Sequence, residues 1–145
     1  MKRIHILLVE DNEGDILLTR EALAEGNFDH ELSVVKDGKE AMQFLVQEEP
    51  FDRTKKPDLV LLDINLPKKS GHEVLSFIKN KEEIKHIPVI MLTTSSSNSD
   101  ILKAYKNHAN CFITKPVDVE DFMETVAMID KFWFKTAVLP SPMQT

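Results

Sequence analysis

Residues 57–63 read Pro-Asp-Leu-Val-Leu-Leu-Asp, so four consecutive apolar residues, Leu59–Leu62, lie between a Pro-Asp pair and a second aspartate. A short apolar run without alternation is typical of a β-strand that is buried on both faces, as the inner strands of a parallel sheet are. Ile4–Val9 and Val89–Leu92 have the same character, and polar residues follow both of them. The sequence therefore predicts three inner strands of a parallel sheet.

Two outer strands and five helices complete the pattern. Glu31–Val35 and Cys111–Thr114 are more mixed, so they are predicted at the outside of the sheet. Apolar residues at helical spacing predict helices over 15–25, 38–47, 71–80 and 99–107. A last helix is predicted from an N-cap at Asp118, with one apolar stripe formed by Val119, Phe122, Val126, Ile129 and Trp133. Strands that alternate with helices predict an α/β fold, a doubly wound five-stranded parallel sheet with helices on both faces.

Composition excludes several classes of protein. The 145 residues suit one domain, and 42% hydrophobic with 29% charged residues is ordinary for a globular protein. Cys111 is the single cysteine, which excludes an internal disulfide and favours a reducing compartment. A formal net charge of −6 argues against direct nucleic-acid binding, which needs clustered Lys and Arg. No apolar stretch approaches the roughly 18 residues of a membrane span, so we expect a cytoplasmic protein without membrane contact.

The residues that end the predicted strands carry the chemistry of this sequence. Ligands in open α/β sheets bind beyond the carboxyl ends of the strands, so side chains at these ends are predicted to meet at one edge. The strand ends carry Glu10-Asp11, Asp63, Thr93-Thr94 and Lys115-Pro116. Three carboxylates, a hydroxyl and an ammonium group would therefore lie together.

This combination of side chains fits both a divalent cation and a phosphoryl group. Two carboxylates about 4 Å apart repel by about 4 kcal/mol at an effective dielectric constant of 20, and a hard cation such as Mg²⁺ relieves the repulsion. The Asp63 carboxylate can attack phosphorus, while Lys115 supplies positive charge and the Thr93 hydroxyl donates to a phosphoryl oxygen. Taken singly, each residue has an ordinary alternative role as a helix-capping acid, a strand threonine or a surface lysine.

On these residues the chain resembles the receiver domains of bacterial two-component response regulators (CheY-like proteins) over about residues 4–133. The motifs that carry the resemblance are Leu8-Val9-Glu10-Asp11-Asn12, Asp63-Ile64-Asn65-Leu66-Pro67 with Gly71, Thr93-Thr94 and Lys115-Pro116. Each motif is weak alone, whereas four in this order are specific. The resemblance implies a flavodoxin-like sheet of order 2-1-3-4-5, a receiver domain over 1–134 and a C-terminal tail over 135–145.

The resemblance also implies the roles of the acidic residues. Asp63 would be the phospho-acceptor. Glu10, Asp11 and Asp63 would hold Mg²⁺ (or Mn²⁺) together with the main-chain carbonyl of Asn65. Glu10 departs from the family pattern, because an aspartate is common at that position.

A second set of residues corresponds to the conformational switch of the family. Thr93 would be the switch hydroxyl and Lys115 the phosphate-binding lysine, with a cis peptide bond between Lys115 and Pro116. Phe112 occupies the position of the switch aromatic residue, which is often tyrosine, so its inward state would gain packing but no hydrogen bond. Thr94 is bulkier than the usual alanine or glycine and is expected to slow the access of water to a phosphoryl group.

Further segments resemble the single-domain regulators that serve bacterial and cyanobacterial phytochrome kinases. These segments are Glu10-Asp11-Asn12-Glu13 with Asp15, the polar loop Glu48–Lys56, 91–96 and Phe132-Trp133-Phe134. They imply a sensor histidine kinase, a phytochrome, as the phosphodonor.

Output is expected either through binding to another protein or through onward transfer of the phosphoryl group, because no effector domain fits after residue 134. Phe132, Trp133 and Phe134 are adjacent and cannot all face inward on one helix. We therefore expect either a homodimer or partner contact at these residues, or a tail that folds back over them.

Three other interpretations fit less well. A haloacid-dehalogenase-type, Mg²⁺-dependent phosphatase needs a second aspartate two residues after its nucleophile, where this chain has Asn65, so a phospho-acceptor that is not an enzyme is preferred. A flavodoxin-type cofactor binder would place a phosphate beside the acidic residues 10–13, which would repel it. A receiver-like module with an inactive site would not be expected to keep the complete set of residues.

Overall fold

The computed structural model describes residues 3–26 and 29–140. Its five strands form one parallel sheet in the order β2-β1-β3-β4-β5. The strands are β1 (Ile4–Val9), β2 (His30–Val35), β3 (Leu59–Leu62), β4 (Val89–Thr93) and β5 (Cys111–Thr114). The predicted fold class and the strand order implied by the resemblance are confirmed.

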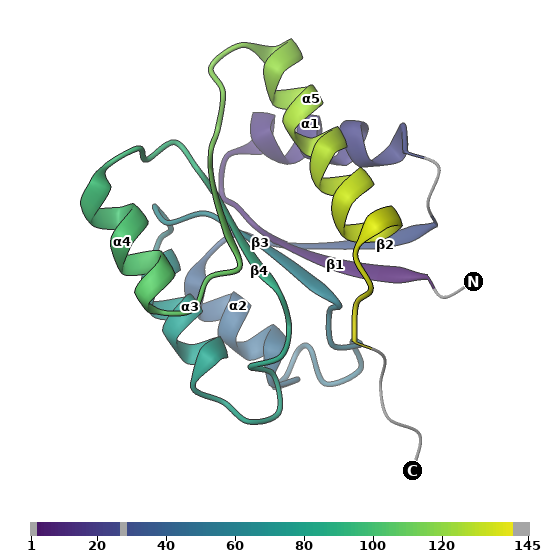
Figure 1. Cartoon of the computed structure of the whole chain (residues 1–145). Helices are drawn as coiled ribbons and strands as arrows, with labels where there is room; N and C mark the ends of the chain where they lie inside the picture. Colours follow the sequence, from purple (N-terminus) through teal and green to yellow (C-terminus); the bar gives the residue numbers. More distant parts are fainter. Residues whose placement is uncertain (1–2, 27–28, 141–145) are drawn as a thin grey trace.

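Helices cover both faces of the sheet, with α1 and α5 on one face and α2, α3 and α4 on the other (Figure 1). Their bounds are α1 (Glu13–Ala24), α2 (Gly38–Leu45), α3 (Gly71–Lys79), α4 (Asn98–Lys106) and α5 (Val119–Asp130). Each helix begins after a side chain that accepts a hydrogen bond from a backbone N–H of the first turn, which satisfies a donor that the helix leaves free. These N-caps are Asn12, Asp37, Ser70, Ser97 and Asp118.

The core has two layers, one on each face of the sheet. Side chains alternate along β1, so Leu7 and Val9 pack with α2, α3 and α4, whereas Ile6 and Leu8 pack with α1 and α5. All four residues of β3 are fully buried, as expected for an inner strand. The sheet is therefore held rigidly from both sides, and its carboxyl ends form a fixed platform.

The end of α5 differs from the prediction. The helix continues as a π-helical turn, η1 (Lys131–Thr136), in which the N–H of Ala137 donates to the carbonyl of Phe132 at 2.7 Å. The wider turn brings Phe134 to the buried face, whereas Trp133 is half-buried. Val119, predicted in the buried stripe, is 56% exposed because it lies at the first position of the helix. The stripe that packs on the sheet is therefore Phe122, Val126, Ile129 and Phe134, and the half-buried Trp133 packs against the same cluster.

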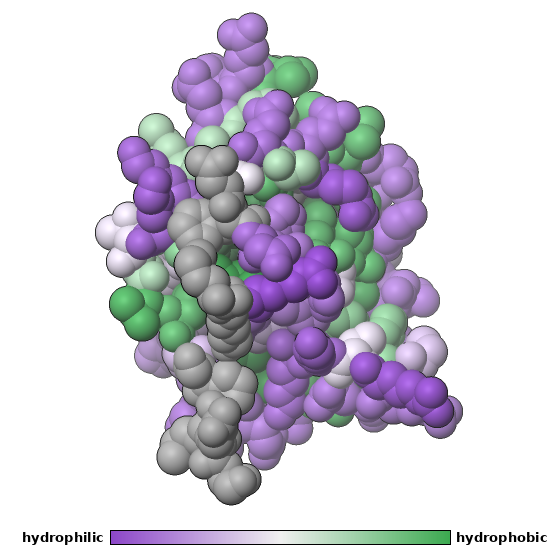
Figure 2. Space-filling model, turned by 90° about the vertical axis from the view of Figure 1, so that its right-hand side faces the viewer, coloured by the Kyte–Doolittle hydropathy of each residue, from purple (hydrophilic) through white to green (hydrophobic). Residues whose placement is uncertain are grey.

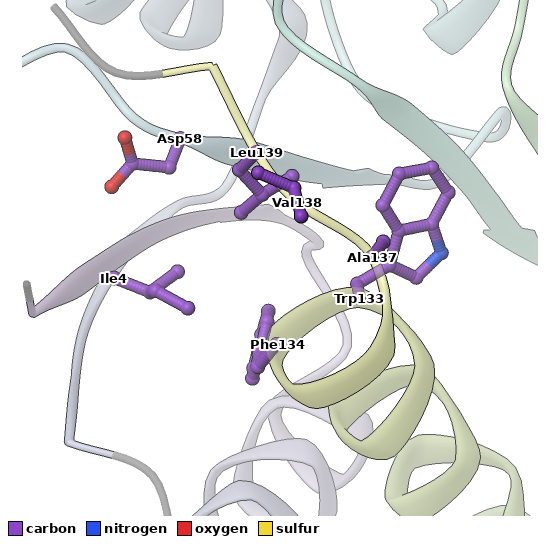
Figure 3. A pocket seen from close by; sticks show the side chains of 7 residues that line it. All are labelled: Ile4, Asp58, Trp133, Phe134, Ala137, Val138 and Leu139. Carbon is purple, nitrogen blue, oxygen red and sulfur yellow. The ribbon is translucent and has the colours of Figure 1, made fainter.

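The segment after η1 lies beside the start of β1. Figure 3 shows a pocket that Ala137, Val138 and Leu139 line together with Ile4, Phe134 and Trp133; Phe134 lies on the side of Ile4, and Trp133 lies on the opposite side. Residues 137–139 thus return beside Trp133 and Phe134, whereas Phe132 is exposed, so the predicted cover over the aromatic cluster is seen only in part. Residues 141–145 of the predicted tail lie outside the described residues.

The surface on the side where β1 begins is mostly hydrophilic, with hydrophobic residues in separate patches (Figure 2). The loop Glu48–Lys56 contacts the interior, because the ring centroid of Phe51 lies 5.3 Å from that of Phe44 and the Lys56 carbonyl lies 3.3 Å from Nδ1 of the buried His5. Among the described helices, none has both the length and the apolar character that crossing a bilayer would require.

Candidate functional site

The ends of β1, β3 and β5 bring Glu10, Asp63 and Lys115 together, as the sequence predicts. All three side chains are buried, and Asp11 beside them is exposed. Backbone hydrogen bonds hold the strand ends in register: the N–H of Asp63 donates to Val9 at 3.1 Å, and that of Lys115 donates to Thr93 at 2.6 Å. The site is therefore built on the rigid edge of the sheet.

Lys115 is the centre of the arrangement. Its Nζ forms an ion pair with Glu10 and lies 2.9 Å from Oδ2 of Asp15 and 3.3 Å from Oδ2 of Asp63. Burial lowers the pKa of Lys115, but the hydrogen bonds to Glu10 and Asp15 and the charge of Asp63 outweigh it, so the pKa lies above its usual value. Lys115 is a permanent positive charge inside an acidic cluster.

The carboxylates form a set that suits a hard divalent cation. One oxygen each of Glu10, Asp11 and Asp63 lies within 4.8 Å of the others. Burial raises the pKa of Glu10 to about 7, and the charge of Asp63 adds to this effect although Lys115 opposes it. Formally, three carboxylates stand against the single positive charge of Lys115. Oxygen ligands with this excess charge fit Mg²⁺ or Mn²⁺.

The Asp63 carboxylate is oriented by the backbone that follows it. Its Oδ1 accepts hydrogen bonds from the N–H groups of Ile64 at 2.7 Å and Asn65 at 3.4 Å. Its Oδ2 points to Lys115. The loop thus holds Oδ1 of Asp63, and Oδ2 lies beside the Lys115 ammonium group. In this position Oδ2 can attack a phosphorus atom.

The two predicted switch residues lie next to this site. Thr93 is fully buried at the end of β4, and its hydroxyl accepts a hydrogen bond from the N–H of Ser95 at 3.4 Å. Phe112 is half-buried against the core, and its N–H donates to the Tyr105 hydroxyl at 3.1 Å. The positions of Thr93 and Phe112 do not test their switching roles, which stay predictions.

The expected cis bond between Lys115 and Pro116 is wrong for this structure. The cis peptide bond in the described part of the chain is Glu49–Pro50, so Lys115–Pro116 is trans. The trans form is the more stable one for most bonds that precede proline. Lys115 reaches all three carboxylates from the trans backbone.

Two features of the site are not predicted from the sequence: the contact of Asp15 with Lys115, and the hydrogen bonds of Asp100 with Ser95 and His72. Asp15, in the first turn of α1, binds Lys115. Behind Thr93, the Ser95 hydroxyl donates to Asp100 at 2.6 Å, and Asp100 also lies 2.9 Å from Nε2 of the buried His72. Asp15 follows the end of β1 by six residues, which is a weak signal, and nothing in the sequence marks His72.

The aromatic cluster lies away from this edge, at the far end of α5. Phe132 is 53% exposed, Trp133 is half-buried and Phe134 is buried, so only the first two remain available as interface candidates. Beside them an apolar groove runs between α5 and the edge strand β5. It is lined by Cys111, Ile113, Thr125, Met128, Ile129, Phe132 and Trp133, together with Asn110.

Comparisons with known proteins agree with this geometry. The family described as response regulator receiver domain matches residues 6–127. Response regulator Rcp1 of Synechocystis sp. is 44% identical over 136 residues, which cover 94% of this chain and 92% of that protein.

Two solved structures are similar over almost their whole length. The phosphorylated cyanobacterial phytochrome response regulator RcpA has a TM-score of 0.94 and 47% identity, covering 97% of this chain and 100% of that chain. The Mn²⁺-bound form of Rcp1 has a TM-score of 0.93 and 43% identity, covering 95% and 99%.

Proposed function

The chain belongs to the family of response regulator receiver domains, and on this premise we propose that Asp63 accepts a phosphoryl group from a phosphohistidine of a sensor histidine kinase. The observation that carries the proposal is the contact of buried Lys115 with Asp63 and Glu10 at the carboxyl edge of the sheet. This arrangement supplies a carboxylate nucleophile and a positive charge for the incoming group.

The reaction requires little covalent assistance from the protein. An oxygen of Asp63 attacks phosphorus and the phosphorus–nitrogen bond of the donor breaks. The electron pair passes to the imidazole, which leaves as neutral histidine when its other ring nitrogen carries a proton. Ile64 and Asn65 hold the carboxylate in place through their N–H groups, and Lys115 stabilises the charge on the phosphoryl oxygens.

We also propose a divalent cation, Mg²⁺ or Mn²⁺, at Glu10, Asp11, Asp63 and the main-chain carbonyl of Asn65. When bound, the cation would neutralise negative charge on the carboxylates and the phosphoryl group. Two observations support it: the grouping of carboxylate oxygens and the Mn²⁺-bound form of the similar Rcp1.

The similar proteins indicate the class of kinase. RcpA is described as a cyanobacterial phytochrome response regulator. We therefore propose a phytochrome-type histidine kinase as the phosphodonor of this chain. Two exposed apolar side chains supply surface for a protein partner: Leu17 and Val117, which lie two residues after Asp15 and Lys115 in the sequence.

The proposed output is a change in the surface formed by α4, β5 and α5. A phosphoryl group on Asp63 would draw the Thr93 hydroxyl toward it, and Phe112 would turn inward into the space left behind. The apolar groove beside β5, with exposed Met128 and Phe132, is the proposed contact of a homodimer. Sedimentation equilibrium of the wild type and of Phe132→Ser, each with and without phosphorylation, tests this: the wild type should dimerise and the variant should remain monomeric.

Asp63→Asn tests the central proposal. This variant should keep the circular dichroism spectrum and unfolding midpoint of a folded protein, but should take no label from radioactive acetyl phosphate or from a phosphorylated kinase. Addition of EDTA should stop labelling of the wild type. Labelling of Asp63→Asn at the wild-type rate would contradict the proposal, and turnover of a phosphomonoester would favour the phosphatase, which Asn65 otherwise argues against.

A further inference from the structure

Asp15 gives Lys115 a carboxylate partner that the strand ends do not provide. It lies in the first turn of α1, where Asn12 caps its N–H, and its Oδ2 is 2.9 Å from Nζ of Lys115. This distance is shorter than the 3.3 Å between Lys115 and Asp63. The Asp15 side chain is 27% exposed and that of Lys115 is 4% exposed, so Asp15 binds the buried ammonium from the side of the solvent.

Asp15 differs from the other partners of Lys115 in one respect. Glu10 and Asp63 belong to the carboxylate group that fits a divalent cation, and Asp15 does not. The formal charges of that cation and Lys115 together balance those of Glu10, Asp11 and Asp63. Asp15 then adds a negative charge that nothing else in this set compensates.

We propose that Asp15 is a positioning residue that holds Lys115 in the unphosphorylated state and opposes the phosphorylated state of Asp63. The inference rests on the proposed function. A phosphoryl group adds negative charge and needs the N–H donors of Lys115. Asp15 competes for the same ammonium group, and its own charge repels the phosphoryl oxygens. The Asp15–Lys115 contact thus limits how far and how long Asp63 remains phosphorylated.

The test is a titration with beryllofluoride, a non-covalent phosphoryl analogue, at saturating Mg²⁺, followed by backbone amide shifts. Asp15→Asn should bind the analogue about three- to tenfold more tightly than the wild type, the range expected for loss of one competing hydrogen bond. Asp15→Glu keeps the carboxylate and should bind within about twofold of the wild type.

Glu13→Gln is the matched control. Glu13 lies in the same turn of α1 and loses the same charge, but it is exposed and pairs with Lys36. Glu13→Gln should bind the analogue with an affinity within about twofold of the wild type. This result would show that the effect of Asp15→Asn comes from the contact with Lys115 and not from the loss of one negative charge near the site. In EDTA, the Nζ resonance of Lys115 should shift in Asp15→Asn and remain unchanged in Glu13→Gln.

The outcomes are distinct. Unchanged or weaker binding by Asp15→Asn, or an equal gain in Glu13→Gln or Asp15→Glu, overturns the role of Asp15 while leaving Asp63 as the acceptor. Failure of the wild type itself to bind beryllofluoride or to react with acetyl phosphate contradicts the proposed function instead. Should Asp15→Asn not fold, Asp15→Ser provides the same comparison.

Discussion

Gly71 lies directly against the main-chain carbonyl of Asp63: a Cβ at Gly71 would meet that oxygen at 2.1 Å. The N–H of Gly71 also donates to the carbonyl of Ile64 at 2.8 Å. The start of α3 is thus pressed onto the loop that carries the proposed acceptor. Only a residue without a side chain permits this approach, which explains why a glycine begins the helix.

We expect Gly71→Ala to lower the free energy of unfolding by about 1–3 kcal/mol, because the added methyl group must displace backbone atoms. The same displacement should move Asp63 and slow labelling by acetyl phosphate. Gly14→Ala is the control, since its Cβ would meet only the side-chain oxygen of Asn12 at 3.3 Å. Urea unfolding should find Gly14→Ala close to the wild type, and an equal loss in both variants would contradict the steric explanation.

Asp11→Asn removes one carboxylate from the cluster without removing a partner of Lys115. In EDTA we expect it to raise the free energy of unfolding by about 0.5–1 kcal/mol, because like charges repel less. In millimolar Mg²⁺ the order should reverse, since the wild type gains stability from the bound cation and the variant does not. Glu21→Gln, an exposed change further along α1, should show no such reversal in urea unfolding.

The affinity for Mg²⁺ should depend on pH through Glu10. Its pKa of about 7 means that a proton competes with the cation below neutral pH. We expect affinity to rise about tenfold between pH 6 and pH 8 and to level off above that range. Calorimetric titration measures this rise, and Glu10→Gln should bind weakly with no dependence over the same interval. A flat profile for the wild type would contradict the role of Glu10.

The Asp100 network should contribute stability at neutral pH. The Ser95 hydroxyl and then His72 hold the pKa of Asp100 below its usual value. The stabilisation is therefore present above about pH 3.8 and is lost as the pH falls through the lower pKa of the folded state. Asp100→Asn should cost about 1 kcal/mol at pH 7, and the difference should shrink toward pH 3. Asp52→Asn, in an exposed loop, should be neutral at both values of pH when unfolding by urea is compared.

The π-helical turn predicts which aromatic residue supports the fold. Phe134 is 7% exposed, so Phe134→Ala should cost about 3–5 kcal/mol. Phe132→Ala should cost less than about 1 kcal/mol in the monomer, since this ring is exposed. Thermal unfolding at low protein concentration measures both. A larger loss of stability in Phe132→Ala than in Phe134→Ala would contradict the burial of Phe134 by η1.

Much of the fold could be predicted from local sequence patterns. The bounds of β1 and β3 are those expected from their apolar runs, the bounds of β5 are those predicted for a mixed outer strand, and α5 begins after Asp118 as predicted. The meeting of Glu10, Asp63 and Lys115 also followed from the sequence, because parallel strands end at the same edge of a sheet. Their chemical roles remain predictions that the experiments above address.

The remaining features depended on contacts between distant segments. Lys115 binds Asp15 because its side chain, which follows β5, reaches the first turn of α1, and Phe134 is buried because a π-helical turn shifts the apolar face. His72 is buried because α3 packs beside α4, where Asp100 accepts its hydrogen bond. Residue patterns determine which segments become strands and helices, since these depend on periodicity and caps along the chain. Which helix side chain reaches into the site depends on the packing angle and register between elements, and only the tertiary structure decides these.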